Sequence, residues 1–132
     1  MVDIPRIADA RGTLSVVEGK PLLPFDPRRF FYIYDVAPGA ERGCHALRFD
    51  EEMIVAIAGS FTIRVDDGES VQEMVLDRPD RGLYVPPLTW HVLHGFSPGA
   101  VCAVFASAPY NPDGYFRVYE EFLEAVRERD AR

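Results

Sequence analysis

The sequence predicts an all-β barrel followed by one C-terminal α-helix. Two observations lead to this prediction: short runs rich in β-branched and aromatic residues recur at regular intervals, and helical periodicity is found only after residue 111. Strands spaced in this way without helices between them favour a sandwich or barrel over alternating β-α units. At 132 residues the chain is long enough to bury one core, so we expect a single domain over residues 1–132.

About nine strands are predicted in chain order. Each combines β-branched or aromatic residues with flanking turn signals, and they cover residues 13–18, 29–35, 43–48, 53–58, 60–66, 71–76, 82–85, 91–96 and 101–107. Three prolines predict a loop at residues 19–27, and Asp66-Asp67-Gly68 predicts a hairpin turn. In the second of these strands, alternation places Phe30, Tyr32 and Tyr34 on one face and Phe31 and Ile33 on the other.

The helix is predicted at the C-terminus, over about residues 112–129. Asn111 is a suitable cap and Pro112 suits the first helical position. Apolar residues then recur at helical spacing, opposite Glu120, Glu121 and Glu124; they are Phe116, Tyr119, Phe122, Leu123 and Val126.

Composition narrows the possible partners. A net charge of −7 disfavours nonspecific binding to nucleic acid or to an anionic membrane. The apolar runs are shorter than a membrane span and the chain does not open with a signal-like segment, so we expect a cytoplasmic protein. Cys44 and Cys102 are expected to be reduced thiols in the core.

Several arginines fall beside the predicted strands and turns of this acidic chain. Such local cations are needed to bind a phosphorylated ligand. They are Arg28, Arg29, Arg42, Arg48, Arg78 and Arg81.

Residues 39–59 resemble the first motif of the cupin superfamily. Gly39, His45, Glu52 and Gly59 stand at the spacing of that motif, and Leu47 stands where a second histidine is usual. Residues 82–91, which end in Trp90-His91, resemble the second motif. This resemblance implies a cupin jelly-roll barrel with a site inside it.

Longer strings resemble the FdtA/QdtA (WxcM-like) family of dTDP-4-keto-6-deoxyglucose 3,4-ketoisomerases. These strings lie at residues 9–14, 29–35, 42–46, 77–91 and 106–110, within a likeness that covers about residues 7–125. The resemblance implies an enzyme of deoxysugar biosynthesis that converts a dTDP-linked 4-keto sugar to its 3-keto isomer without a metal or other cofactor. It also implies a homodimer that exchanges N-terminal strands.

The family chemistry moves a proton from C3 to C4 of the sugar through an enediol, and histidine suits such acid/base work near neutral pH. By resemblance, His45 is the acid/base residue and Tyr32 a proton carrier or oxyanion donor. The substrate-binding residues implied are Arg42, Arg11, His91, Tyr84 and Glu52.

Two departures from the family pattern leave alternatives open. Leu47 replaces the family's second histidine and cannot transfer a proton, which raises the alternative of a sugar-nucleotide binding protein without activity. Glu52 stands where the family commonly has glutamine. Together with His45 and His91 it would make a set of two histidines and one carboxylate, which is typical of iron or manganese sites, so a metal-dependent cupin enzyme is the other alternative.

Overall fold

The computed structural model describes residues 1–20 and 22–132, and two five-stranded antiparallel sheets form the body of the molecule. The first sheet has the order β1-β9-β6-β11-β4, with strands β1 (Val2–Asp3), β9 (Arg81–Val85), β6 (Glu52–Ala58), β11 (Val101–Ala106) and β4 (Arg29–Ile33). The second has the order β12-β5-β10-β7-β8, with strands β12 (Tyr115–Phe116), β5 (Arg42–Leu47), β10 (Trp90–His94), β7 (Phe61–Asp66) and β8 (Val71–Leu76).

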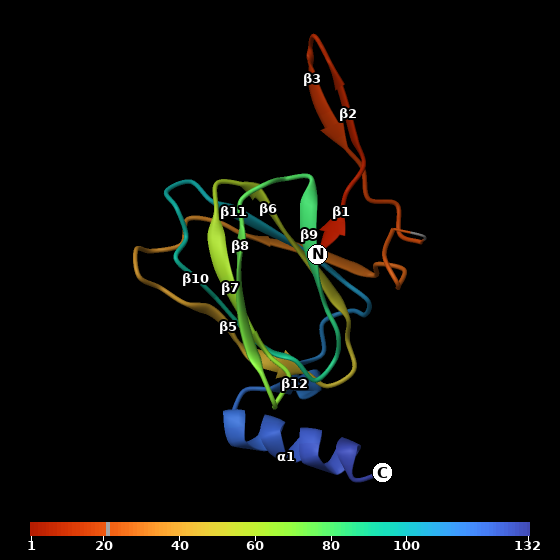
Figure 1. The fold of residues 1–132 in the computed structure, drawn as a ribbon, viewed down its shortest axis with the longest axis vertical. Coiled ribbons are helices and arrows are strands. Elements are labelled where there is room, and N and C mark those ends of the chain that lie inside the picture. The colour runs from red at the N-terminus through yellow and green to blue at the C-terminus, as the bar shows by residue number, and fades with distance from the viewer. Residues whose placement is uncertain (21) are drawn as a thin grey trace.

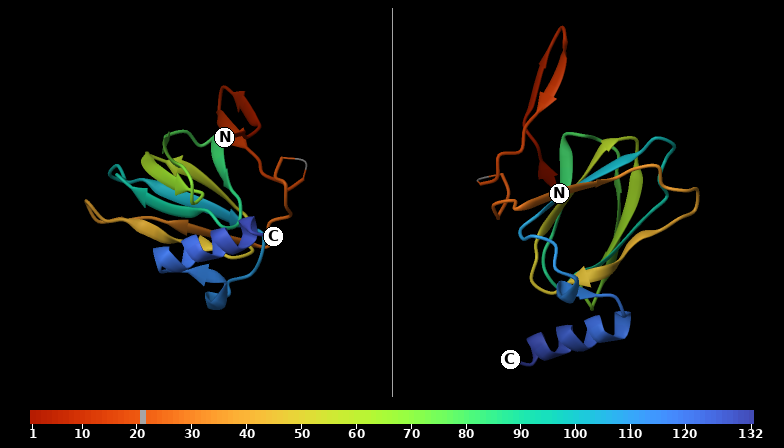
Figure 2. Two further views of the ribbon diagram at one scale, coloured as in Figure 1. Left: turned by 60° about the horizontal axis from the view of Figure 1, so that its bottom comes forward. Right: turned by 180° about the vertical axis from the view of Figure 1, so that it is seen from behind.

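The two sheets face each other as the walls of a barrel (Figure 1, Figure 2). Inward side chains from both sheets form the main core, including Ile54, Ile63, Leu83, Leu93 and Val104. Alternating apolar residues on short strands therefore bury one face of each sheet against the other. The predicted cupin-type barrel is confirmed. In the predicted loop at residues 19–27, the described residues contain no helix or strand, and Pro21 lies outside the described residues.

A separate hairpin, here called the N-terminal arm (residues 6–15), projects away from the barrel (Figure 1). It consists of β2 (Arg6–Asp9) and β3 (Gly12–Ser15), which pair with each other and with no other strand among the described residues. Every residue of both strands is exposed, including Ile7 at 62% and Leu14 at 57%. Because an isolated two-stranded hairpin is at best marginally stable in water, this arm needs a surface to pack on.

The C-terminal segment differs from the prediction of one helix over residues 112–129. Asn111 does cap a helical turn, but that turn is only a 3-10 helix, Pro112–Gly114, in which the Asp113 amide donates to Asn111 Oδ1. Tyr115 and Phe116 then pair with β5 as β12, so the α-helix α1 begins at Tyr119 and ends at Asp130. Strand pairing to β5 therefore overrides the helical periodicity at residues 115–116.

Helix α1 lies at the end of the barrel opposite the arm (Figure 1). Phe122 and Val126 pack against Ala46 and Phe116 and are buried. The Tyr119 hydroxyl donates to Asp66 Oδ2 of β7 at 2.5 Å, which fixes the first turn of the helix to the second sheet. Among the described residues, no helix has both the length and the apolar character needed to cross a membrane.

Candidate active site

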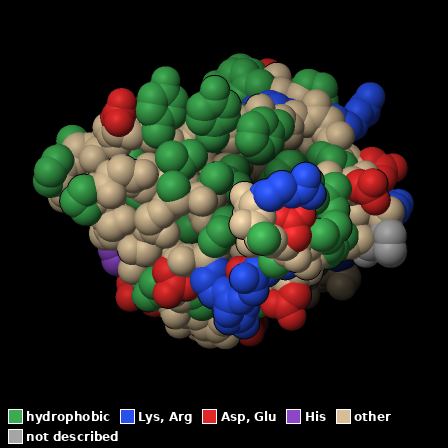
Figure 3. Space-filling view, turned by 90° about the horizontal axis from the view of Figure 1, so that it is seen from above, with side chains coloured by type: hydrophobic (Ala, Val, Ile, Leu, Met, Phe, Trp, Pro, Cys, Tyr) green, Lys and Arg blue, Asp and Glu red, His purple; other side chains and the backbone are tan. Residues whose placement is uncertain are grey.

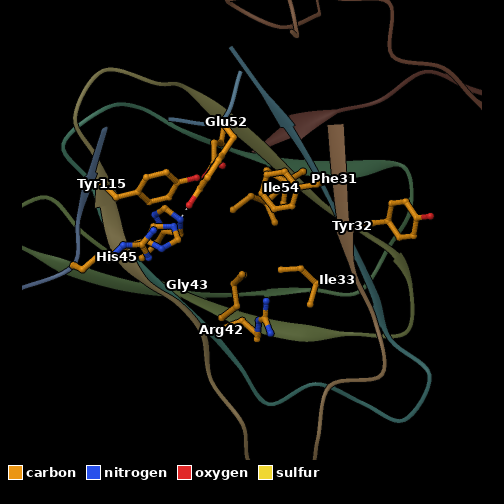
Figure 4. Close-up of a pocket in the computed structure, with 14 residues that line it drawn as sticks. Phe31, Tyr32, Ile33, Arg42, Gly43, His45, Glu52, Ile54 and Tyr115 are labelled. Carbon is orange, nitrogen blue, oxygen red and sulfur yellow. Dashed lines mark ion pairs between the residues drawn. The ribbon is translucent and has the colours of Figure 1, made fainter. Parts of the chain in front are cut away.

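A cavity of about 300 Å³ opens between the two sheets of the barrel (Figure 4). One side of its lining is apolar and includes Phe31, Ile33, Ile54, Leu93 and Val104. The other side has protic or charged side chains, namely Arg42, His45, Glu52, His91, Tyr110, Tyr115 and Arg117. A small apolar chamber with a few convergent polar groups is typical of a ligand site.

A β-bulge in β5 sets the position of His45. His45 pairs with His91 and Gly43 with Val92, so the residue between them, Cys44, has no partner on β10. Gly43 and Cys44 both have positive φ angles, +80° and +60°. At Gly43 an added Cβ would lie 3.1 Å from the His91 carbonyl oxygen, so the glycine permits this close approach. Such bulges redirect neighbouring side chains, and here His45 lines the cavity.

The same bulge corrects one prediction. Cys44 was expected to be a core thiol, but the bulge places it at the surface, whereas Cys102 is buried in β11 as expected. Both thiols are free.

Glu52 and His91 form a buried pair in the wall of the cavity. Glu52 Oε1 lies 3.4 Å from His91 Nε2, and both side chains are only 3% exposed. His91 Nδ1 lies 3.1 Å from the Thr89 carbonyl oxygen, which can only accept, so Nδ1 carries a proton and Nε2 faces the carboxyl group. The pair therefore presents a carboxyl group and an imidazole side by side at the edge of the cavity.

His45 stands among side chains that disfavour its protonation. Burial, followed by the positive charges that His91, Arg117 and Arg29 contribute, lowers the pKa of His45 from 6.5 to about 3. Its ring lies edge-on to that of His91, with the ring centroids 4.8 Å apart. A neutral imidazole at neutral pH has a free nitrogen lone pair, so His45 is ready to accept a proton.

Tyr115 is a cavity residue that the sequence analysis missed. Its ring lies edge-on to His45 with centroids 4.9 Å apart, and Arg29 Nη2 donates to its hydroxyl at 3.2 Å. The guanidinium of Arg117 lies over the same ring, 4.6 Å from its centroid. In the sequence, one sign that this stretch is not helical is the low helix propensity of Gly114, Tyr115 and Phe116.

The structure does not bring Tyr84 or Arg11 to this cavity, and Tyr32 borders it without directing its ring inward. Tyr32 is on the outer face of β4, and its ring points away from the cavity while Phe31 and Ile33 point in (Figure 4). Tyr84 donates to Glu51 Oε1 at 2.6 Å, and its ring packs near Phe25 outside the cavity. Arg11 is at the turn of the arm, where it pairs with Asp9.

Besides Tyr32, the predicted residues that line the cavity are Arg42, His45, Glu52 and His91. Leu47 is 3% exposed and is not part of the lining. In the described part of the chain, no three His, Cys, Asp or Glu side chains are grouped closely enough to hold a metal ion. The site therefore offers acid/base groups and arginine cations as its chemistry.

A barrel of this kind with histidines in its cavity defines a cupin-type protein with an acid/base site. A family model described as FdtA, WxcM-like, C-terminal, matches residues 1–127. The chain belongs to this family.

Individual relatives agree with that assignment. The chain is 38% identical over 126 residues to TDP-4-oxo-6-deoxy-alpha-D-glucose-3,4-oxoisomerase from Aneurinibacillus thermoaerophilus, covering 96% of this chain and 91% of the relative. It is similar in structure to QdtA, a sugar 3,4-ketoisomerase from Thermoanaerobacterium thermosaccharolyticum solved with TDP, at a TM-score of 0.94 and 32% identity, covering 97% and 93% of the two chains.

A third relative is the WlaRB TDP-quinovose 3,4-ketoisomerase from Campylobacter jejuni. It matches at a TM-score of 0.89 and 36% identity, covering 93% of this chain and 95% of that one. All three relatives are named as sugar 3,4-ketoisomerases or 3,4-oxoisomerases, and they support the isomerase prediction rather than the metalloenzyme or binding-protein alternatives.

Proposed function

We propose that this protein is a sugar-nucleotide 3,4-ketoisomerase that converts a TDP-linked 4-keto-6-deoxyhexose to the 3-keto isomer in deoxysugar biosynthesis. The observation that carries the proposal is the neutral imidazole of His45 in the barrel cavity, in a chain of the FdtA family. The reaction moves one proton between carbons and one between oxygens, with no net oxidation. The cavity contains imidazole, phenol and guanidinium groups, which can transfer these protons and bind an anionic substrate.

His45 is the proposed base. It removes the C3 proton, the electron pair forms the C3–C4 double bond of the enediol, and the resulting imidazolium returns a proton to C4. The lowered pKa of His45 keeps the imidazole neutral before the reaction and makes its protonated form a strong acid for the return of the proton to C4. General acid–base catalysis of this type contributes about 10²–10⁴-fold to the rate.

The arginines of the cavity are the proposed cations for the anionic substrate. Arg42 and Arg117 line the cavity and have no ion-pair partner among the described residues. A guanidinium group donates two parallel hydrogen bonds to a phosphate, so both are suited to the diphosphate or to the sugar oxygens next to it. The Glu52–His91 pair is proposed to hold a sugar hydroxyl.

The N-terminal arm supports a homodimer. Strand β4 is at the edge of its sheet, with only β11 beside it. A row of neighbouring aromatic rings is exposed on its outer face and just beyond its end, namely Phe30, Tyr32 and Tyr34, at 53%, 58% and 60%. In Figure 3 hydrophobic side chains gather along one edge of the face seen from above. We propose that the arm of each protomer packs on the β4 edge of the other.

This exchange of arms would place Arg11 near the cavity of the other protomer and Tyr32 in the dimer interface. Strand β4 borders the cavity, so an arm packed along it brings Arg11 close to the site of the other protomer. Tyr32 would then lie in the interface rather than in the cavity of its own chain. The proposed location is the cytoplasm, since the free thiols Cys44 and Cys102 are typical of a reducing compartment.

The direct test is incubation of the chelator-treated protein with TDP-4-keto-6-deoxyglucose, followed by proton NMR of the products. A 3-keto product formed at the same rate with and without chelator is the expected result. Activity that is lost with chelator and restored by iron or manganese would support a metal site at His45, Glu52 and His91. TDP binding without any product would identify a binding protein.

A further inference from the structure

The ketoisomerase reaction needs a second proton carrier besides His45. While a proton moves from C3 to C4, the oxygen on C4 must gain a proton and the oxygen on C3 must lose one. Leu47 cannot supply this exchange, and the Tyr32 hydroxyl points away from the cavity (Figure 4). The carrier must therefore be another protic group that faces the same cavity as His45.

Tyr115 is placed directly beside the position of Leu47. The two residues are cross-strand partners in the β12–β5 pair, and directly opposed residues share one face of a sheet. Their neighbours Phe116 and Ala46, on the other face, pack against helix α1. The phenol of Tyr115 thus enters the barrel where a longer side chain at position 47 would also reach.

The surroundings of Tyr115 suit a group that gives up and regains a proton. Arg29 Nη2 donates to the Tyr115 oxygen at 3.2 Å, so the hydroxyl proton is free to donate to a ligand. The guanidinium of Arg29 would stabilise negative charge that develops on that oxygen. Arg29 Nε is buried and has no hydrogen-bond partner within the described residues, so the hydrogen bond to Tyr115 is made by the Nη2 end of the guanidinium.

We propose that Tyr115 is a catalytic residue that exchanges the oxygen-bound protons, an inference that rests on the ketoisomerase function. In the first half-reaction, His45 takes the C3 proton while Tyr115 donates its hydroxyl proton to the C4 oxygen, which gives the enediol and a tyrosinate paired with Arg29. In the second, the tyrosinate takes the proton of the C3 hydroxyl and the imidazolium returns a proton to C4. Both residues end as they began.

The test compares wild-type protein with Tyr115→Phe, which keeps the ring against His45 and removes only the hydroxyl. We expect kcat to fall about 100-fold, with KM and TDP affinity unchanged within a few-fold. Tyr119→Phe is the matched control, because it also removes one hydrogen-bonded hydroxyl of this segment but one that contacts Asp66 outside the cavity. We expect its kcat to equal that of wild type.

A folded Tyr115→Phe variant with wild-type kcat would overturn the proposal. Should that variant fail to fold, Arg29→Met keeps the phenol and removes its cation, with an expected loss of about tenfold in kcat; an unchanged kcat there would overturn the proposal as well. If the protein is not a ketoisomerase, the wild-type protein itself gives no 3-keto product. That result would overturn the proposed function and, with it, the role of Tyr115.

Discussion

The rings of His45 and His91 stand edge-on across the β5–β10 pair, with their centroids 4.8 Å apart. His91 is tied through Nδ1 to the Thr89 carbonyl oxygen and faces Glu52 through Nε2. His45 has no such carboxylate partner and lies among cations, so its imidazole stays neutral at neutral pH. The different surroundings of the two imidazoles thus suit His45 to act as a base and His91 to bind through its partners.

His45→Asn should abolish isomerisation with TDP affinity unchanged within a few-fold, because the substitution removes the base but keeps a polar side chain of similar length. The expected loss in kcat is about 10²–10⁴-fold. Steady-state kinetics and calorimetric titration with TDP measure the two quantities. His94→Asn is the matched control, since His94 pairs with Glu73 outside the cavity. Unchanged turnover in His45→Asn would remove His45 from the mechanism.

Lowering the pH should destabilise the fold through His45. In the folded protein this imidazole is protonated only near pH 3, whereas in an unfolded chain it is protonated near pH 6.5. Between these values the unfolded state binds more protons, so the free energy of unfolding falls as the pH drops below about 6.5 and is unaffected by His45 above it.

Urea denaturation of wild type and His45→Asn, at several pH values between about 7.5 and about 4.5, isolates this contribution. The stability of wild type relative to the variant should decrease steadily on acidification. Parallel stability curves for the two proteins would show that the pKa of His45 is not depressed in the folded state.

Leu47→His should restore activity to the Tyr115→Phe variant. An imidazole at position 47 is the cross-strand neighbour of residue 115 and can replace the lost proton carrier. We expect the double variant to exceed Tyr115→Phe by at least about tenfold in kcat. Leu47→Asn in the same background is the control, because an amide at that position cannot exchange protons near neutral pH.

In the wild-type background, Leu47→His should change kcat by no more than a few-fold, because Tyr115 already acts there. A large gain from Leu47→His alone would instead mean that the natural site lacks an effective second carrier. That result would contradict the role given to Tyr115.

Charges on one face of the arm should dissociate the proposed homodimer. Ile7 and Leu14 are cross-strand partners and both are exposed. Ile7→Asp together with Leu14→Asp should therefore give a monomer of 14.9 kDa where wild type has twice that mass, measured by light scattering after size exclusion. Thr13→Asp, which places a charge on the opposite face, should remain dimeric. A dimeric double variant, or a monomeric wild type, would contradict the exchange of arms.

The strand pattern predicts the barrel, and the family resemblance predicts several of the polar residues in its cavity. Short runs of β-branched and aromatic residues predict strands because such side chains fit a half-buried pleated surface. The cupin-like spacing of His45, Glu52 and His91 then brings these three residues into one cavity, as predicted. Both predictions rest on features that can be read from neighbouring residues, namely strand-forming runs and the spacing of motif residues.

Other features depend on tertiary structure. Alternation in β4 separates Tyr32 from Phe31, but it does not reveal which face points inwards. Tyr115 belongs to a stretch whose helical periodicity is genuine from Tyr119 onward, and only pairing with β5 converts residues 115–116 into a strand. Arg11 lies in the arm, whose two strands pair with each other and with no other described strand, so local sequence patterns do not reveal what the arm packs on.

The most direct test of the account is proton NMR of TDP-4-keto-6-deoxyglucose in D₂O, with wild-type protein and with His45→Asn. For wild type, we predict a 3-keto product and loss of the C3 proton signal, with the proton or a deuteron delivered to C4. His45→Asn should leave the C3 signal intact. A wild-type protein that forms no product and leaves C3 unexchanged, or an His45→Asn variant that reacts as fast as wild type, would contradict the account.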